Sequence, residues 1–123
     1  MVDLAKRLAI HHGTEISGIT TPGETIDFPD DSFDIVHITN TIHHVASKQK
    51  LFSEIHRVLK PNGRFFSIDP LAYNPVINVY RRMATQVRTE DEAPLSLKDV
   101  ALVKQYFKDV QHREFWIFSM LLF

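Results

Sequence analysis

The chain has 123 residues, of which 44% are apolar and 24% are charged, and this ordinary balance predicts one globular domain or part of one. Its formal net charge of -1 gives no electrostatic argument for binding nucleic acid or an anionic membrane surface. The absence of cysteine excludes disulfides and thiolate metal sites, and makes a reducing cytoplasm the expected location.

The first elements that the sequence predicts are a helix and two strands. Val2–His11 has apolar residues at helical spacing, and Gly13 follows at the position of a C-cap. Glu15–Thr20 is a candidate strand. Phe33–Thr39 (FDIVHIT) is a nearly continuous apolar run, which predicts a strand buried on both faces.

A strand–helix–strand unit is predicted in the middle of the chain. Ser47 is the expected N-cap of a helix that runs through Leu59. The apolar face of this helix is formed by Leu51, Phe52, Ile55, Val58 and Leu59. Lys60–Gly63 turns the chain into the next strand, Arg64–Ile68. This strand should pair in parallel with Phe33–Thr39, so the chain is assigned to the α/β class.

The last part of the chain is predicted to hold two helices and a strand. The helices are Tyr73–Val87 and Leu97–Phe107, separated by the polar loop Arg88–Pro94, and the strand is Val110–Phe118. The tail Phe115–Phe123 is strongly apolar, but a helix that spans a bilayer needs about 20 residues. A buried strand is therefore expected here.

Three segments are expected to lie together at one edge of the sheet. They follow the predicted strands and comprise Thr20–Glu24, Thr39–His44 and Asp69–Asn74. Open α/β sheets bind ligands beyond the carboxyl ends of their strands. The pattern alone therefore places the candidate site at this edge.

The stretch Ile26–Ile68 reads IDFPDDSFDIVHITNTIHHVASKQKLFSEIHRVLKPNGRFFSI. It closely resembles the middle of a class I methyltransferase that uses S-adenosylmethionine (SAM), of the small-molecule, methyltransferase type 11-like kind. The resemblance implies a Rossmann-like fold, with a mostly parallel sheet flanked by helices. It also implies methyl transfer from SAM to a small-molecule acceptor.

The glycine-rich loop that this family uses to hold SAM has no counterpart in the sequence. The chain has four glycines, and none of them forms a GxGxG pattern. The resemblance therefore implies that residues 1–123 are a single partial domain, the C-terminal portion of an N-terminally truncated methyltransferase that lacks the first two strands. SAM binding by this chain alone is expected to be weak. The free edge of Phe33–Thr39 should be apolar and exposed, which predicts self-association.

Five residues are candidates for SAM binding by resemblance. The adenine contacts of the family fall on Pro22 and Gly23, but proline offers no side-chain acceptor, and Glu24 is the nearest substitute. Thr39 and Asn40 match positions that lie against the methionine part and the sulfonium. The alternatives are that Pro22-Gly23 is a simple turn, and that Thr39 and Asn40 are a strand end satisfied by its own hydrogen bonds.

Three residues are candidates for catalysis by the same resemblance. His44 would face the cleft and orient a substrate or remove its proton, which suits a side chain that titrates near neutral pH. Asp69 would reach the substrate from a strand end, and the Tyr73 ring would contact the sulfonium. The alternative for His44 is a structural role at the turn or at the helix start near Ser47.

No metal site is expected, although the chain has seven histidines. Adjacent histidines point apart, and no HExxH spacing occurs. Two further functions compete with the enzyme: a non-catalytic methyltransferase-like remnant that acts as a binding or assembly module, and an inactive fragment. Nucleic acid is not an expected partner of any of the three.

Overall fold

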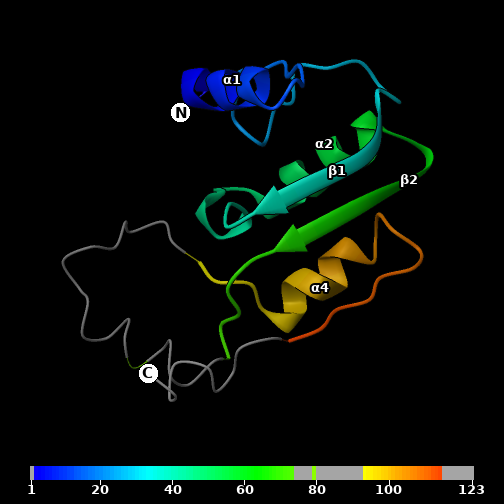
Figure 1. The fold of residues 1–123 in the computed structure, drawn as a ribbon. Coiled ribbons are helices and arrows are strands. Elements are labelled where there is room, and N and C mark those ends of the chain that lie inside the picture. The colour runs from blue at the N-terminus through cyan, green and yellow to red at the C-terminus, as the bar shows by residue number, and fades with distance from the viewer. Residues whose placement is uncertain (1, 74–78, 80–92, 115–123) are drawn as a thin grey trace.

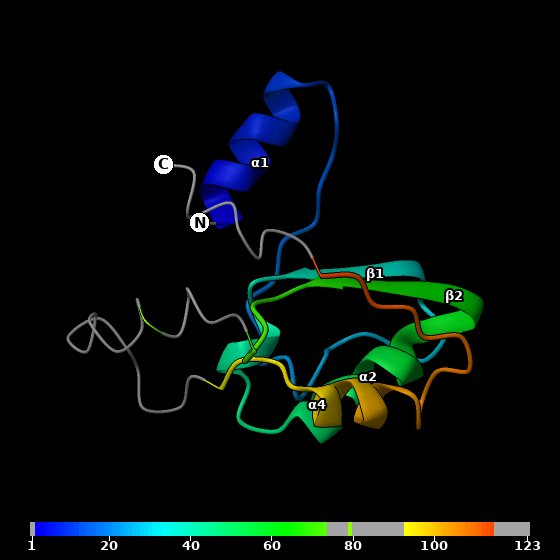
Figure 2. The same ribbon diagram turned by 90° about the horizontal axis from the view of Figure 1, so that it is seen from below.

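The computed structural model describes residues 2–73, 79 and 93–114. Its elements in chain order are α1 (Val2–His11), β1 (Phe33–Thr39), the 3-10 turn η1 (Ile42–His44), α2 (Lys48–Val58), β2 (Leu59–Ile68) and α4 (Leu97–Val103). α2 and α4 lie on one face of the sheet formed by β1 and β2, whereas α1 stands apart on the other side (Figure 1, Figure 2). This arrangement confirms the predicted α/β class.

β1 and β2 pair in parallel, as the strand–helix–strand pattern predicts. The register runs evenly from Ile35 opposite Arg64 to Thr39 opposite Ile68. β2 begins earlier than predicted, because Leu59 already pairs with Phe33 before an irregular stretch. Within that stretch a side chain at Gly63 would approach the Leu59 side chain and the Lys60 carbonyl oxygen to 2.9 Å, so glycine is required there.

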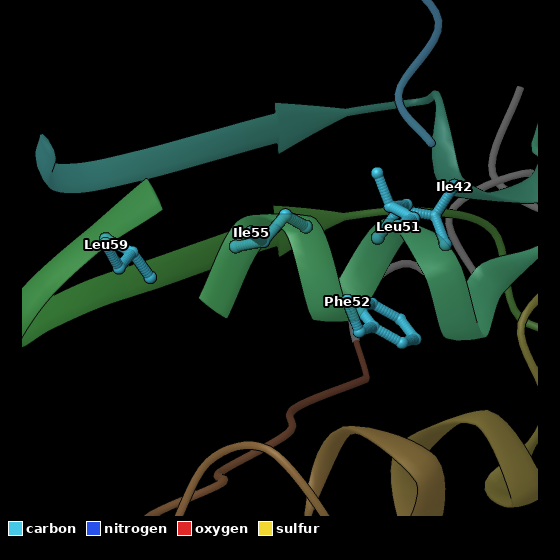
Figure 3. Close-up of a cluster of buried hydrophobic side chains, with 5 residues drawn as sticks. All are labelled: Ile42, Leu51, Phe52, Ile55 and Leu59. Atoms are coloured by element: carbon cyan, nitrogen blue, oxygen red, sulfur yellow. The ribbon is translucent and has the colours of Figure 1, made fainter. Parts of the chain in front are cut away.

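The core lies between α2 and the sheet (Figure 3). Its buried side chains are Ile42, Leu51, Phe52, Ile55 and Leu59. The predicted apolar face of the helix is therefore confirmed, and Val58 is buried as well. Burying each of these side chains contributes about 1.5–3 kcal/mol. The Ser47 hydroxyl accepts a hydrogen bond from the Lys50 N–H at 3.4 Å, which confirms the predicted N-cap.

The prediction that β1 is buried on both faces is wrong. Val36 and Ile38 are half-buried against the core, but Ile35 on the other face is 60% exposed. Phe66 and Ile68 of β2 share that uncovered face and are 50% and 63% exposed. The described helices α2 and α4 cover only the opposite face. The apolar side chains of Phe33–Thr39 are therefore buried on one face of the sheet only.

The prediction of a strand at Glu15–Thr20 is also wrong, because these residues have irregular backbone structure. Ile16 and Ile19 are 43% and 49% exposed, and no described strand lies beside them to accept their backbone hydrogen bonds. Residues 110–114, the described part of the predicted last strand, do not form a strand either. The predicted helix after Tyr73, the loop that follows it and the apolar tail lie almost wholly outside the described residues.

The segment before β1 is fastened to α2 by Arg57 and Glu54. Arg57 donates hydrogen bonds to the carbonyl oxygens of Ile26 and Phe28 at 2.8 and 2.9 Å, and to both Glu54 oxygens. Glu54 in turn accepts from the Ile26 N–H at 3.0 Å. The hydrogen bond from Arg57 lowers the pKa of Glu54 to about 2. None of the described helices is long and apolar enough to cross a membrane.

Candidate functional site

The carboxyl ends of β1 and β2 lie side by side, as expected. Thr39 pairs with Ile68, and the Asn40 N–H donates to the Ile68 carbonyl oxygen at 2.8 Å. Asn40 has a φ of 50°, a left-handed conformation that asparagine tolerates better than most residues. This backbone places Asn40 and Asp69 at the same edge of the sheet.

Asp69 is held by His43, which is not among the predicted site residues. Asp69 Oδ1 lies 2.8 Å from His43 Nδ1 and accepts a hydrogen bond from the His43 backbone N–H at 3.3 Å. The side chains are 0% and 7% exposed, respectively. Asp69 Oδ2 is buried and has no hydrogen-bond partner among the described residues. Asp69 Oδ1 therefore faces His43, and the expected role of Asp69 in reaching the substrate stays a prediction.

His44 is exposed and lies against its neighbour. The ring centroids of His43 and His44 are 4.0 Å apart and the rings are tilted by 41°. His44 is thus the accessible imidazole of the pair, and His43 is the structural one. The sequence feature that could have identified His43 is Asp69, the acid that directly follows β2. Parallel neighbouring strands bring the loops at their carboxyl ends together, so a residue after β1 is expected to contact it.

The segment with Pro22, Gly23 and Glu24 is docked at the start of α2. Glu24 Oε1 accepts hydrogen bonds from the N–H groups of Ala46 and Ser47 at 3.1 and 3.4 Å. A Cβ at Gly23 would lie 3.0 Å from Leu51 Cδ1, so the backbone approaches α2 closely here. The Thr25 N–H donates to the Pro22 carbonyl oxygen at 3.1 Å, which makes the turn that was the alternative interpretation.

Thr39 and Asn40 are exposed at the end of β1. Thr39 Oγ1 lies 3.3 Å from His37 Nε2, and the Thr39 carbonyl oxygen accepts from the Thr41 hydroxyl at 2.9 Å. Tyr73 is 57% exposed and follows Leu71, which bridges to Leu95. The edge therefore offers a hydroxyl, an amide, an imidazole and a phenol to solvent.

The start of α2 is held by residues from the C-terminal part of the chain. Lys48 Nζ donates to the Ala93 carbonyl oxygen at 3.1 Å and lies 3.3 Å from Asp99 Oδ2. Burial raises the pKa of Asp99, but hydrogen bonds from Ser96 and the charge of Lys48 outweigh it and hold that pKa below its usual value. These contacts join the start of α2 to α4 below the candidate site.

Exposed oxygen atoms of Thr39 and Asn40 can face a positive centre without charge repulsion. Within the described part of the chain, no cluster of three or more metal-ligating side chains occurs. His44 is an exposed imidazole in the turn that follows β1.

The comparisons with known proteins agree with this geometry. A family model described as a methyltransferase domain matches residues 1–67. The uncharacterized methyltransferase YcgJ of Bacillus subtilis is 34% identical over 90 residues, which cover 72% of this chain and 36% of that protein. The ubiquinone/menaquinone biosynthesis C-methyltransferase UbiE of Hahella chejuensis is 30% identical over 81 residues, covering 63% of this chain and 32% of UbiE.

The fold is similar to that of a solved methyltransferase structure. The crystal structure of Bacillus subtilis YcgJ superposes with a TM-score of 0.66 at 29% identity, covering 85% of this chain and 46% of that one. The matched part thus spans about a third of the length of the two curated relatives, at 36% and 32%.

Proposed function

This chain belongs to the methyltransferase domain family, and we propose that it serves SAM-dependent methyl transfer to a small-molecule acceptor, as the C-terminal part of a class I methyltransferase. The observation that carries the proposal is the meeting of Asn40 and Asp69 at adjacent strand ends, with the Gly23-Glu24 segment docked at the start of α2. Ligands of open α/β sheets bind at this edge.

The residues present fit part of a SAM site. Thr39 and Asn40 would lie against the methionine part, and the Gly23 N–H and Glu24 would lie near the adenine. SAM, when bound, supplies an activated methyl group for direct displacement. The contribution of the protein is then to orient the acceptor and exclude water.

His44 is the proposed acid–base residue at this edge. Its imidazole is accessible, and histidine changes charge near neutral pH, so it can take a proton from an acceptor. Asp69 and His43 act as positioning residues in this proposal, because their contact fixes the turn that carries His44. Tyr73 would border the acceptor.

The site is proposed to need further contacts. The sequence has no GxGxG pattern, so the backbone N–H groups of such a loop must come from another polypeptide segment. Each missing hydrogen bond is worth about 0.5–1.5 kcal/mol. SAM affinity of the 123-residue chain is therefore expected in the millimolar range.

One observation favours the competing function, a non-catalytic assembly module. The Glu24 carboxylate already accepts hydrogen bonds from Ala46 and Ser47, so it is engaged by the fold. A remnant that had lost SAM would keep such a contact.

Calorimetric titration of the purified chain with SAM and with its demethylated product separates the two functions. Saturable binding of both ligands, weakened by Asn40→Ala but unchanged by the distant Ile10→Ala, is the expected result. SAM with a labelled methyl group would then be offered with quinols, because the name of UbiE indicates a C-methyltransferase of quinone biosynthesis. Failure of both ligands to bind at concentrations well above the expected dissociation constant would contradict the proposal and favour the assembly module.

A further inference from the structure

The backbone of the turn that carries His44 is held by hydrogen bonds on both of its sides. The Ala93 N–H donates to the His43 carbonyl oxygen at 2.9 Å, and the His44 N–H donates to the Thr41 carbonyl oxygen at 3.0 Å. The carbonyl group of His43 and the N–H of His44 belong to one peptide unit, which is planar. The two hydrogen bonds therefore fix the orientation of the peptide from which the His44 side chain departs.

The segment 93–95 runs beside the part of the chain that leaves β2. The Leu95 N–H donates to the Pro70 carbonyl oxygen at 3.0 Å, and the Ala72 N–H donates to the Leu95 carbonyl oxygen at 2.8 Å. A parallel bridge also joins the two segments. These contacts set the direction of the segment, but they do not engage the carbonyl group of Ala93.

Lys48 engages that carbonyl group. Lys48 is the first residue of α2, and its Nζ donates to the Ala93 carbonyl oxygen at 3.1 Å and lies 3.3 Å from Asp99 Oδ2. Lysine and aspartate side chains are mostly exposed in proteins. The side chains of Lys48 and Asp99 are only 14% and 16% exposed, so the ammonium group is withdrawn from water at a fixed position.

The carboxylate of Asp99 is oriented independently of Lys48. Its Oδ2 accepts hydrogen bonds from the Ser96 N–H at 2.7 Å and from the Ser96 hydroxyl at 2.8 Å. Ser96 directly precedes α4, so these bonds anchor the carboxylate to the start of that helix. Because Asp99 is already ordered, pairing with Lys48 costs less side-chain entropy. The anchored carboxylate keeps the ammonium group where it also reaches Ala93.

We propose that Lys48 is a positioning residue for His44. It acts through the Ala93 backbone on the His43–His44 peptide, and it thereby fixes the direction of the His44 imidazole at the strand ends. The described contacts of its ammonium group are with Ala93 and Asp99, neither of which is a proposed ligand-binding residue. The inference rests on the proposed acid–base role of His44, because proton transfer requires an oriented base.

Amide hydrogen exchange of the full chain, followed by NMR, tests the proposal without any ligand. Lys48→Met keeps a long side chain and removes its charge. The amides of Ala93 and His44 should then exchange at least about tenfold faster, because local opening affects only the amides that it exposes. The amides of Ile55 and Val58, in the buried face of α2, should stay within about twofold of the parent.

Two further lysine variants control this measurement. Lys50→Met removes the charge of an exposed lysine on the same helix, and it should leave the exchange of Ala93 and His44 unchanged. Lys48→Arg restores a positive charge and hydrogen-bond donors. Exchange of the two amides in Lys48→Arg should return to within about threefold of the parent.

The imidazole of His44 gives a second readout. Its ring centroid lies 4.0 Å from that of His43, so the proton signals of the His44 ring depend on how the two rings lie against each other. Lys48→Met should shift these signals, and Lys48→Arg should restore them. Asp99→Asn leaves Lys48 in place but removes the charge that it meets, and should shift the signals by a smaller amount. A residue that only stabilised the fold would change the unfolding midpoint without moving them.

Three results would overturn the proposal. One is exchange of Ala93 and His44 in Lys48→Met at the rate of the parent. Another is equal acceleration at Ile55 and Val58, which would make Lys48 a stabiliser of the whole fold. The third is a His44 ring signal that neither Lys48→Met nor Asp99→Asn moves.

Circular dichroism checks that each variant folds, and Asp99→Asn carries the test if Lys48→Met does not. The measurements involve neither SAM nor an acceptor. A chain that binds no SAM but shows the expected exchange contradicts the proposed function alone, whereas a chain that binds SAM with unchanged exchange contradicts only the role of Lys48.

Discussion

Asp69 Oδ1 contacts both the ring and the backbone of His43, at 2.8 Å from Nδ1 and 3.3 Å from the backbone nitrogen. One buried carboxylate oxygen thereby fixes the turn after β1 to the end of β2. The contact is local to the candidate site, and it defines which imidazole of the histidine pair remains available to a ligand.

Replacing His43 by alanine should destabilise the fold by about 1–3 kcal/mol, because a buried carboxylate loses its ring partner. Urea denaturation measures the change. His12→Ala, at an exposed position just after α1, is the control and should change stability by less than about 0.5 kcal/mol. Nitrogen NMR should find Nδ1 of His43 protonated. A neutral ring with its proton on Nε2 only would contradict the contact.

The Glu54–Arg57 pair should make stability depend on acid pH. The hydrogen bond from Arg57 lowers the pKa of Glu54 from 4.5 to about 2. A lowered carboxyl pKa gives stability that is present above pH 4.5 and is lost as the pH falls towards 2. Asp34, whose pKa is lowered by Lys60, adds to the same trend.

Glu54→Gln should therefore be less stable than the parent at neutral pH, and its stability should fall less steeply between pH 4.5 and 2. Urea midpoints measured across this range test the expectation. Glu15→Gln, which changes an exposed glutamate of an irregular segment, should keep the parent slope. Equal slopes for the parent and Glu54→Gln would exclude Glu54 as a source of the acid sensitivity.

Glu24→Ala should cost about 1 kcal/mol of stability, because the N–H groups of Ala46 and Ser47 lose their acceptor at the start of α2. Thermal unfolding provides the measurement, with Glu15→Ala as the control. If Glu24→Ala leaves the melting temperature unchanged, the carboxylate has no capping role and is free to serve a ligand.

Gly23→Ala should be destabilising by about 1–3 kcal/mol, because the new methyl group is forced against Leu51. Leu51→Ala alone removes a core side chain and should cost about 2–5 kcal/mol. The double variant should be more stable than the sum of the two changes predicts, by at least about 0.5 kcal/mol. Strict additivity in urea denaturation would show that the two residues do not touch.

The sequence predicted those features that depend on local pattern. The apolar face of α2 and its cap at Ser47 follow from helical spacing and cap chemistry, and both are present. Burial of Ile35 and strand formation by Glu15–Thr20 depend on what lies beside them in space, and local pattern carries no information on that. The choice between His43 and His44 likewise depended on Asp69, which is 26 residues away from His43 in sequence.

The position of the candidate site was predicted from the sequence, but the side-chain contacts within it were not. Thr39, Asn40 and Asp69 do meet at one edge, because parallel strands align their carboxyl ends. The partners of Glu24 and Asp69 were missed, since each is set by a contact between segments that are distant in sequence.

The most direct test of the proposed SAM site is a titration of the nitrogen-labelled chain with SAM, followed by amide NMR. If SAM binds at the strand ends, weak, saturable shifts are expected at Gly23, Thr39, Asn40 and His44, and none at α1 or at Phe33. An unchanged spectrum at millimolar SAM, or shifts confined to residues away from the strand ends, would contradict the claim that this edge is a SAM site.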